Sequence, residues 1–124
     1  MYHAVIHLDH HLAEVLHFDD NQVQSTRVER HHHASHHQGG ESKDLKAFFD
    51  KVCTALQDAH EVLVTGSHPV IGELRHHIES HHPALAPRIA DYRPAAPLSQ
   101  GQLLAMARQF FKAYDRMAGV PTPT

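Results

Sequence analysis

Three short stretches of alternating apolar and polar residues fill the first thirty positions, and they constrain the fold more than any other feature of the chain. In the first stretch Ala4, Ile6 and Leu8 share one face of an extended segment, which is the period-two pattern of a strand. Asp9-His10-His11 and Asp19-Asp20-Asn21 supply turn signals between the stretches. Strands are predicted over residues 2–9, 12–18 and about 22–30. The three indicate an antiparallel meander, and the polar third strand is expected at an edge.

Helical and strand patterns alternate over the rest of the chain. Apolar residues recur at helical spacing after Ser42, which we expect to cap the first helix. A second helix opens around Pro69, a residue suited to a first turn, and Ser99 with Gln102 matches the capping box of a third. Strands are also predicted at 61–65 and 88–93. The order β-β-β-α-β-α-β-α predicts an α/β fold with a mixed sheet covered by helices.

The length of 124 residues and the composition restrict the class of protein. We expect one domain over residues 1–118 and a flexible tail over 119–124. The net charge of −3 is not that of a protein that binds nucleic acid constitutively. The single cysteine, Cys53, fits a reducing compartment, and its place in a helical apolar stripe indicates a buried core residue. No stretch resembles a signal peptide or a membrane span, so we expect a cytoplasmic protein without a membrane partner.

Sixteen of the residues are histidine, and five of them lie within residues 31–37. Imidazole is the commonest metal ligand and titrates near neutral pH. This loop could therefore hold a transition metal, or become a positive patch as the pH falls. The candidate ligands are His31, His33, His36 and His37, and Zn²⁺ or Ni²⁺ is the expected metal. The alternative is a solvated loop with no physiological metal.

Two further groups of residues carry chemistry of their own. His77 and His81 stand one helical turn apart, the spacing with which two imidazoles meet one metal. Because His81 also falls near the apolar stripe of this helix, we expect a partly buried, hydrogen-bonded histidine rather than a metal ligand. Asp9 could belong to a Mg²⁺-dependent nuclease site, but residues 62–65 supply no carboxylate on the central strand. We therefore expect Asp9 to order the hairpin turn.

Basic residues flank the histidine loop. Arg27 and Arg30 precede it and Lys43 follows it, so that all three could meet phosphate groups. The alternative is an ordinary scatter of surface charge. The sequence does not decide between these two readings.

Three segments, taken in order, resemble a known family. They are IHLDHHLAEVLHF at the first hairpin, QGGESKDLKAFF at the entry to the first helix, and VLVTGSHPVIGEL at the next strand-to-helix turn. Over about residues 4–112 the chain resembles the middle domain of archaeal and eukaryotic class-1 peptide-release factors and of Pelota. Stand-alone bacterial proteins of this type are usually labelled translational machinery components. The resemblance implies a ribonuclease-H-like fold.

The resemblance also suggests a function for the loop. Release factors carry Gly-Gly-Gln between the third strand and the first helix, and this chain holds Gln38-Gly39-Gly40 there, in reversed order. The leading hypothesis is a non-enzymatic module that contacts the ribosome or RNA through residues 27–43, by way of Arg27, Arg30, Lys43 and residues 38–40. The second hypothesis is metal storage or sensing by the histidines of the same loop. The third is peptidyl-ester hydrolysis at Gln38.

Overall fold

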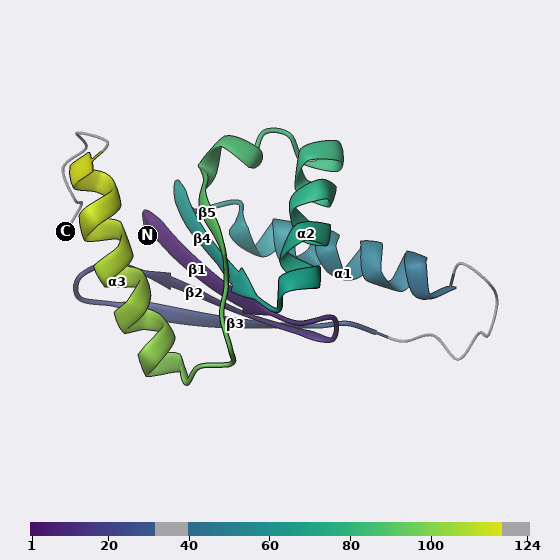
Figure 1. The fold of residues 1–124 in the computed structure, drawn as a ribbon, viewed down its shortest axis with the longest axis horizontal. Helices are drawn as coiled ribbons and strands as arrows, with labels where there is room; N and C mark the ends of the chain where they lie inside the picture. Colours follow the sequence, from purple (N-terminus) through teal and green to yellow (C-terminus); the bar gives the residue numbers. More distant parts are fainter. Residues whose placement is uncertain (32–39, 118–124) are drawn as a thin grey trace.

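The computed structural model describes residues 1–31 and 40–117 of the chain (Figure 1). Its strands are β1 (His3–Leu8), β2 (Leu12–Phe18), β3 (Val23–Glu29), β4 (Glu61–Gly66) and β5 (Ile89–Pro94). Its helices are α1 (Gly40–Leu56), α2 (His68–His81) and α3 (Gln100–Met117), with a short 3₁₀ turn, η1 (Ala86–Arg88), before β5. The predicted order of elements and the α/β class are confirmed.

The five strands form one mixed sheet in the order β3-β2-β1-β4-β5. β1 pairs antiparallel with β2, and β2 pairs antiparallel with β3, because tight polar turns join these strands. β1 pairs in parallel with β4 after the chain has passed through β2, β3 and α1, and β4 pairs in parallel with β5 after α2 and η1. β3 lies at the edge of the sheet and is exposed at every position but Val28, as its polar sequence predicts.

The helices cover the two faces of the sheet unequally (Figure 1). α1 and α2 pack on the face that carries Ala4, Ile6 and Leu8 of β1. α3 packs on the other face, where Val5 and Leu63 meet its apolar stripe. β1 and β4 are therefore buried on both sides, and their side chains form the centre of the core. Within the part of the chain that the structure describes, no helix is long and apolar enough to span a membrane.

Side chains at the turns explain where the elements begin and end. Asp19 Oδ1 accepts hydrogen bonds from the backbone N–H groups of Asn21 and Gln22, at 2.8 and 2.7 Å, and so shapes the β2–β3 turn. The predicted capping box is present at α3: the Ser99 hydroxyl accepts from the Gln102 N–H at 3.2 Å, and the Gln102 amide oxygen accepts from the Ser99 N–H at 3.0 Å. These polar turns fix the register of the apolar faces.

The start of the first helix differs from its prediction. We expected Ser42 to be the N-cap, but α1 begins at Gly40, so that Ser42 lies inside the helix. The apolar stripe begins only at Leu45, and a polar first turn leaves no periodic signal of its own in the sequence. The cap therefore could not be placed from the pattern alone.

Candidate functional site

The segment that the sequence singles out leaves and rejoins the fold at one end of the sheet. β3 ends at Glu29 and α1 begins at Gly40, and Figure 1 shows these two points at the same end of the molecule. His31 is exposed. Five residues of the predicted contact and metal sites lie outside the described residues: His33, His36, His37, Gln38 and Gly39. The metal site in this segment therefore stays a prediction.

Arg30 connects the end of β3 to the β1–β2 turn. Its backbone N–H donates to the His11 carbonyl at 2.9 Å, and its Nη1 donates to the His10 carbonyl at 3.2 Å. Asp9 organises the same turn, since its Oδ1 accepts from the N–H groups of His11 and Leu12 at 2.7 and 2.8 Å. The expectation that Asp9 orders this turn is confirmed. Arg30 has a structural role, whatever it contacts outside the chain.

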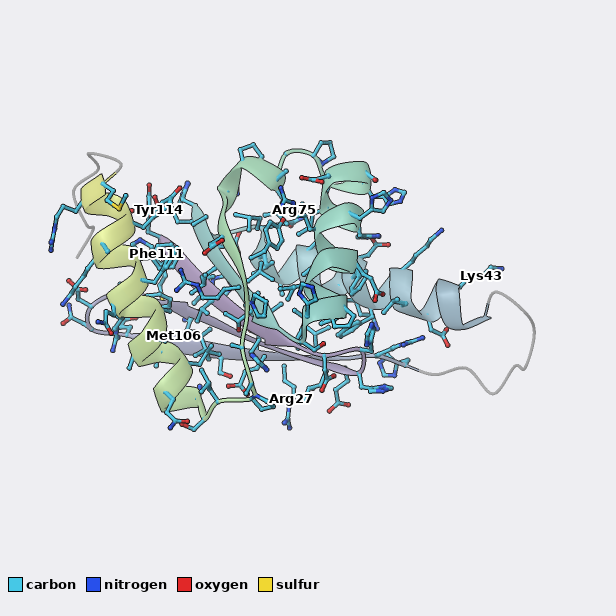
Figure 2. All side chains as sticks on the ribbon, viewed as in Figure 1. Arg27, Lys43, Arg75, Met106, Phe111 and Tyr114 are labelled. Carbon is cyan, nitrogen blue, oxygen red and sulfur yellow. The ribbon has the colours of Figure 1, made fainter. Side chains whose placement is uncertain are left out.

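Arg27 and Lys43 are exposed cations on different parts of the surface. Arg27 lies on β3, in register with Glu14 of β2. Lys43 lies in the first turn of α1, where the positive end of the helix dipole favours anions. Figure 2 shows Lys43 at the tip of the molecule and Arg27 well away from it. A phosphate backbone that contacts both residues would have to extend from the start of α1 to β3.

A cavity of about 370 Å³ opens at the carboxyl ends of the parallel strands β1 and β4, where open α/β sheets commonly bind ligands. His7 lines it, and its Nδ1 donates to the Thr65 hydroxyl at 3.0 Å, while that hydroxyl donates to the Ile6 carbonyl at 2.8 Å. Burial lowers the pKa of His7, which favours the neutral ring. The lining holds two carboxylates, Asp9 and Glu14, of which Asp9 is engaged in its turn, and no carboxylate of β4 joins them where a two-metal nuclease would need several. The described lining therefore does not provide such a site.

A buried polar cluster lies at the amino end of β1. His3 Nε2 lies 2.9 Å from Glu61 Oε1 and 3.0 Å from Asp115 Oδ2, which links β1 and β4 to α3. Burial raises the pKa of Glu61 to about 8, helped by the hydrogen bond and the charge of Asp115. Burial also lowers the pKa of His3, although Asp115 opposes that shift. Asp115 is fully buried, and among the described residues its Oδ1 has no hydrogen-bond partner. The cluster is the polar part of the attachment of α3 to the sheet.

The second histidine cluster is arranged differently from its prediction. The expected buried, hydrogen-bonded histidine is present, but it is His77, whereas His81 is exposed. The spacing along α2 puts both rings on one side of the helix, but only the packing against α1 decides which ring is covered. His77 Nε2 lies 2.7 Å from Asp50 Oδ1, and His82 Nε2 lies 2.8 Å from the same oxygen. Sequence reasoning missed Asp50 because it lies on another helix.

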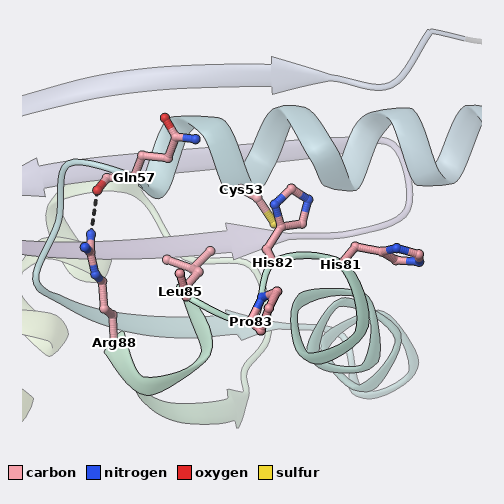
Figure 3. Close-up of a pocket in the computed structure, with 8 residues that line it drawn as sticks. Cys53, Gln57, His81, His82, Pro83, Leu85 and Arg88 are labelled. Atoms are coloured by element: carbon pink, nitrogen blue, oxygen red, sulfur yellow. Dashed lines mark hydrogen bonds between the residues drawn. The ribbon is translucent and has the colours of Figure 1, made fainter.

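Beside this cluster, a cavity of about 490 Å³ lies between α1 and the segment that follows α2 (Figure 3). His82 and Cys53 line it, together with Arg88, whose Nη1 donates to the Gln57 carbonyl at 2.7 Å. Burial raises the pKa of the Cys53 thiol to about 12, so this thiol is not a nucleophile at neutral pH. The prediction that Cys53 is a buried core residue is confirmed.

Comparison of the chain with protein-family models and with curated proteins finds no match. The fold, in contrast, is similar to solved structures over 94% of this chain. Pelota of Archaeoglobus fulgidus matches with a TM-score of 0.62 at 11% identity, and the archaeal translation termination factor aRF1 with 0.59 at 13%. A third structure, of an archaeal protein, matches with 0.51 at 11%.

The chain spans 33% of the length of Pelota and 39% of the length of each of the other two proteins. It is therefore similar to one part of each of them. At these identities the likeness concerns the fold, and the resemblance to a domain of Pelota and of a release factor is confirmed at that level.

Proposed function

We propose that the chain is a cytoplasmic, non-enzymatic, translation-related module that contacts the ribosome or RNA through residues 27–43. The observation that carries the proposal is the similarity of its fold to the translation termination factor aRF1. In the release factors that the sequence resembles, the connection between the third strand and the first helix carries the functional Gly-Gly-Gln. The corresponding connection here joins β3 to α1 and contains Gln38 and Gly39, and Gly40 is the first residue of α1.

The described flanks of this connection are compatible with a phosphate backbone. The exposed Arg27 and Lys43 supply two positive charges. The start of α1 adds the positive end of its helix dipole. Imidazole can take up a proton near neutral pH, so the five histidines within residues 31–37 would add positive charge as the pH falls. Binding should therefore strengthen at lower pH and weaken with salt.

Sedimentation with ribosomes in low-salt lysate, at pH 6.5 and pH 7.5, tests the proposal. The pair of substitutions Arg27→Ala and Lys43→Ala should reduce the bound fraction and lower the salt dependence of binding, by about 1.5 in the slope of log K against log salt. The control pair Lys51→Ala and Lys112→Ala removes the same charge from exposed positions elsewhere. Equal loss in the two pairs would show a non-specific charge effect, and absence of the chain from ribosomal fractions at both pH values would refute the contact.

Metal storage or sensing by the histidine segment is the second candidate function. The observation that favours it is the density of imidazoles at 31–37, of which His31 is exposed. Calorimetric titration with Zn²⁺ and Ni²⁺ should show a site that disappears when His31, His33, His36 and His37 are changed to Ala. The same number of bound equivalents and the same affinities before and after these changes would remove the histidine segment from metal binding.

A further inference from the structure

We propose that Asp50, His77 and His82 form a binding site for one divalent transition-metal ion of the Zn²⁺ class. The three residues come from α1, from α2 and from the position directly after α2. They share no residue with the histidine segment at 31–37. The proposal is also independent of any contact with the ribosome.

The first argument is the convergence of three metal-binding atoms. The Nε2 atoms of His77 and His82 point at one oxygen, Asp50 Oδ1, at 2.7 and 2.8 Å. All three ligand atoms lie within 4.8 Å of one another. Two imidazoles that donate to the same carboxylate oxygen place their Nε2 atoms around a common centre, which a metal ion can take in place of the two hydrogen atoms.

The second argument is the donor set. Two imidazole nitrogens and one carboxylate oxygen are ligands that Zn²⁺ and related ions prefer, and three protein ligands leave a fourth position for water. Bonds of about 2.0–2.1 Å in tetrahedral geometry hold ligand atoms roughly 3.3 Å apart. The Asp50 oxygen has to move back by about half an ångström from its present contacts. The Asp50 side chain is 57% exposed, so it has room to do this.

The third argument is that the protein already orients both rings. The buried His77 ring packs against Phe49 of α1, with 5.5 Å between ring centres. Pro83 follows His82 and disfavours the helical conformation at the residue before it, and His82 has φ −133° and ψ 57°. This bend ends α2, and the His82 ring lies against Asp50 of α1. Because both histidine rings are already held in place, they lose little further conformational entropy when a metal binds.

Solvent reaches the cluster from more than one side. The His82 side chain is 30% exposed. His82 lines the cavity of about 490 Å³ in Figure 3, and His77 lines a groove of about 610 Å³ between α1 and α2. The exposed His81 ring lies beside that of His77, with 4.8 Å between ring centres. A hydrated ion can enter without unfolding of the core.

The proton balance of binding is simple. In the neutral ring the hydrogen on Nε2 moves to Nδ1, which leaves the Nε2 lone pair for the metal. Asp50 binds as the carboxylate, and the hydrogen bonds from His82 and His77 lower its pKa. Acid competes with the metal, because each protonated imidazolium has no lone pair to give.

The test uses the full chain with His31, His33, His36 and His37 changed to Ala, so that the loop does not compete for metal. Calorimetry with Zn²⁺ should show one equivalent bound, and Co²⁺ should give the visible absorption of a tetrahedral site. Asp50→Asn keeps an oxygen that can accept the hydrogen bonds but removes the charge. We expect Asp50→Asn and His82→Ala each to weaken Zn²⁺ binding at least tenfold.

His76→Ala is the matched control, since His76 lies exposed on the same helix and outside the cluster. The Zn²⁺ affinity of this variant should be unchanged. Thermal unfolding without metal shows whether each variant is folded. If the three residues are only a hydrogen-bonded clamp between α1 and α2, Asp50→Asn and His82→Ala will change the melting temperature of the metal-free protein and leave Zn²⁺ affinity as it was. That result, or a loop-substituted chain that binds no Zn²⁺, overturns the proposal.

Discussion

The substitution Glu61→Gln should remove a loss of stability that the wild-type protein suffers at alkaline pH. Glu61 lies in the buried cluster with His3 and Asp115, and its pKa is raised from 4.5 to about 8, chiefly by burial and then by Asp115. Its side chain is only 13% exposed. Glutamine has nearly the shape of the protonated acid, and its amide can also donate a hydrogen bond to Asp115.

The sign and size of the effect follow from the two pKa values. The folded protein keeps the Glu61 proton up to about pH 8, whereas the unfolded chain releases it near pH 4.5. Between these values the folded state binds more protons, so the free energy of unfolding falls as the pH rises. The contribution of the Glu61 proton to the free energy of unfolding is complete below pH 4.5, and it is lost as the pH rises through the pKa of the folded protein, about 8. From pH 7 to pH 9 the loss is about 1.4 kcal/mol.

Other groups in the cluster do not obscure this window. Burial lowers the pKa of His3 below its usual 6.5, so that ring titrates at lower pH. The pKa of Tyr2 is raised above 10, mainly by burial, so its phenol titrates at higher pH. The range from pH 7 to pH 9 therefore isolates Glu61 within the cluster.

Urea unfolding, followed by far-UV circular dichroism at pH 7, 8 and 9, measures the effect. The difference in stability between Glu61→Gln and wild type should grow by about 1.4 kcal/mol across this range in favour of the variant. Glu29→Gln makes the same charge change at an exposed position of β3 and should follow the wild-type curve. Parallel curves for wild type and Glu61→Gln would refute the reasoning, because they would mean that Glu61 is already ionised in the folded state at pH 7.

Three further predictions concern the fold. Gly66→Ala should destabilise the protein by more than about 3 kcal/mol, because φ at Gly66 is +155° and a Cβ there would fall against the Leu8 carbonyl oxygen. Gly72→Ala should stabilise the protein by about 0.5–1 kcal/mol, because a Cβ at this position of α2 has no atom within 4 Å. The urea midpoints of the two variants measure both effects, and similar destabilisation in both would contradict this reasoning. Ser99→Ala should destabilise the protein by about 1 kcal/mol through loss of the cap of α3, and an unchanged midpoint would count against the capping box. Cys53 should resist iodoacetamide at pH 8 until urea unfolds the chain, since its thiol is buried with a pKa of about 12, and rapid labelling of the native protein would disprove this.

Local patterns were sufficient to predict most of the fold. Alternation placed the three strands of the meander, Asp9 and Asp19 marked its turns, and Ser99 with Gln102 marked the start of the last helix. These signals are readable because each depends on residues within a few positions of one another. The first turn of α1 was misplaced because polar residues fit a loop and a helix equally well.

Most of the polar clusters could not be predicted in this way. The sequence marks His3, His7 and His77 as polar residues within or beside apolar patterns, but it does not name their partners. His3 meets Glu61 and Asp115 across 58 and 112 positions of the chain, and such pairs carry no local signal.

The sequence by itself determined the elements, their order, the edge position of β3 and the presence of an unusual density of imidazoles, because backbone preference and hydrophobic period are local properties. Only the tertiary structure decided which histidines are buried and which carboxylates they meet. Packing of α1 against α2 brings Asp50 to His77 and His82, and packing of α3 on the sheet brings Asp115 to His3. The physical reason is that burial and proximity, which set the pKa of a group and its capacity to bind metal, arise only when distant segments share one volume.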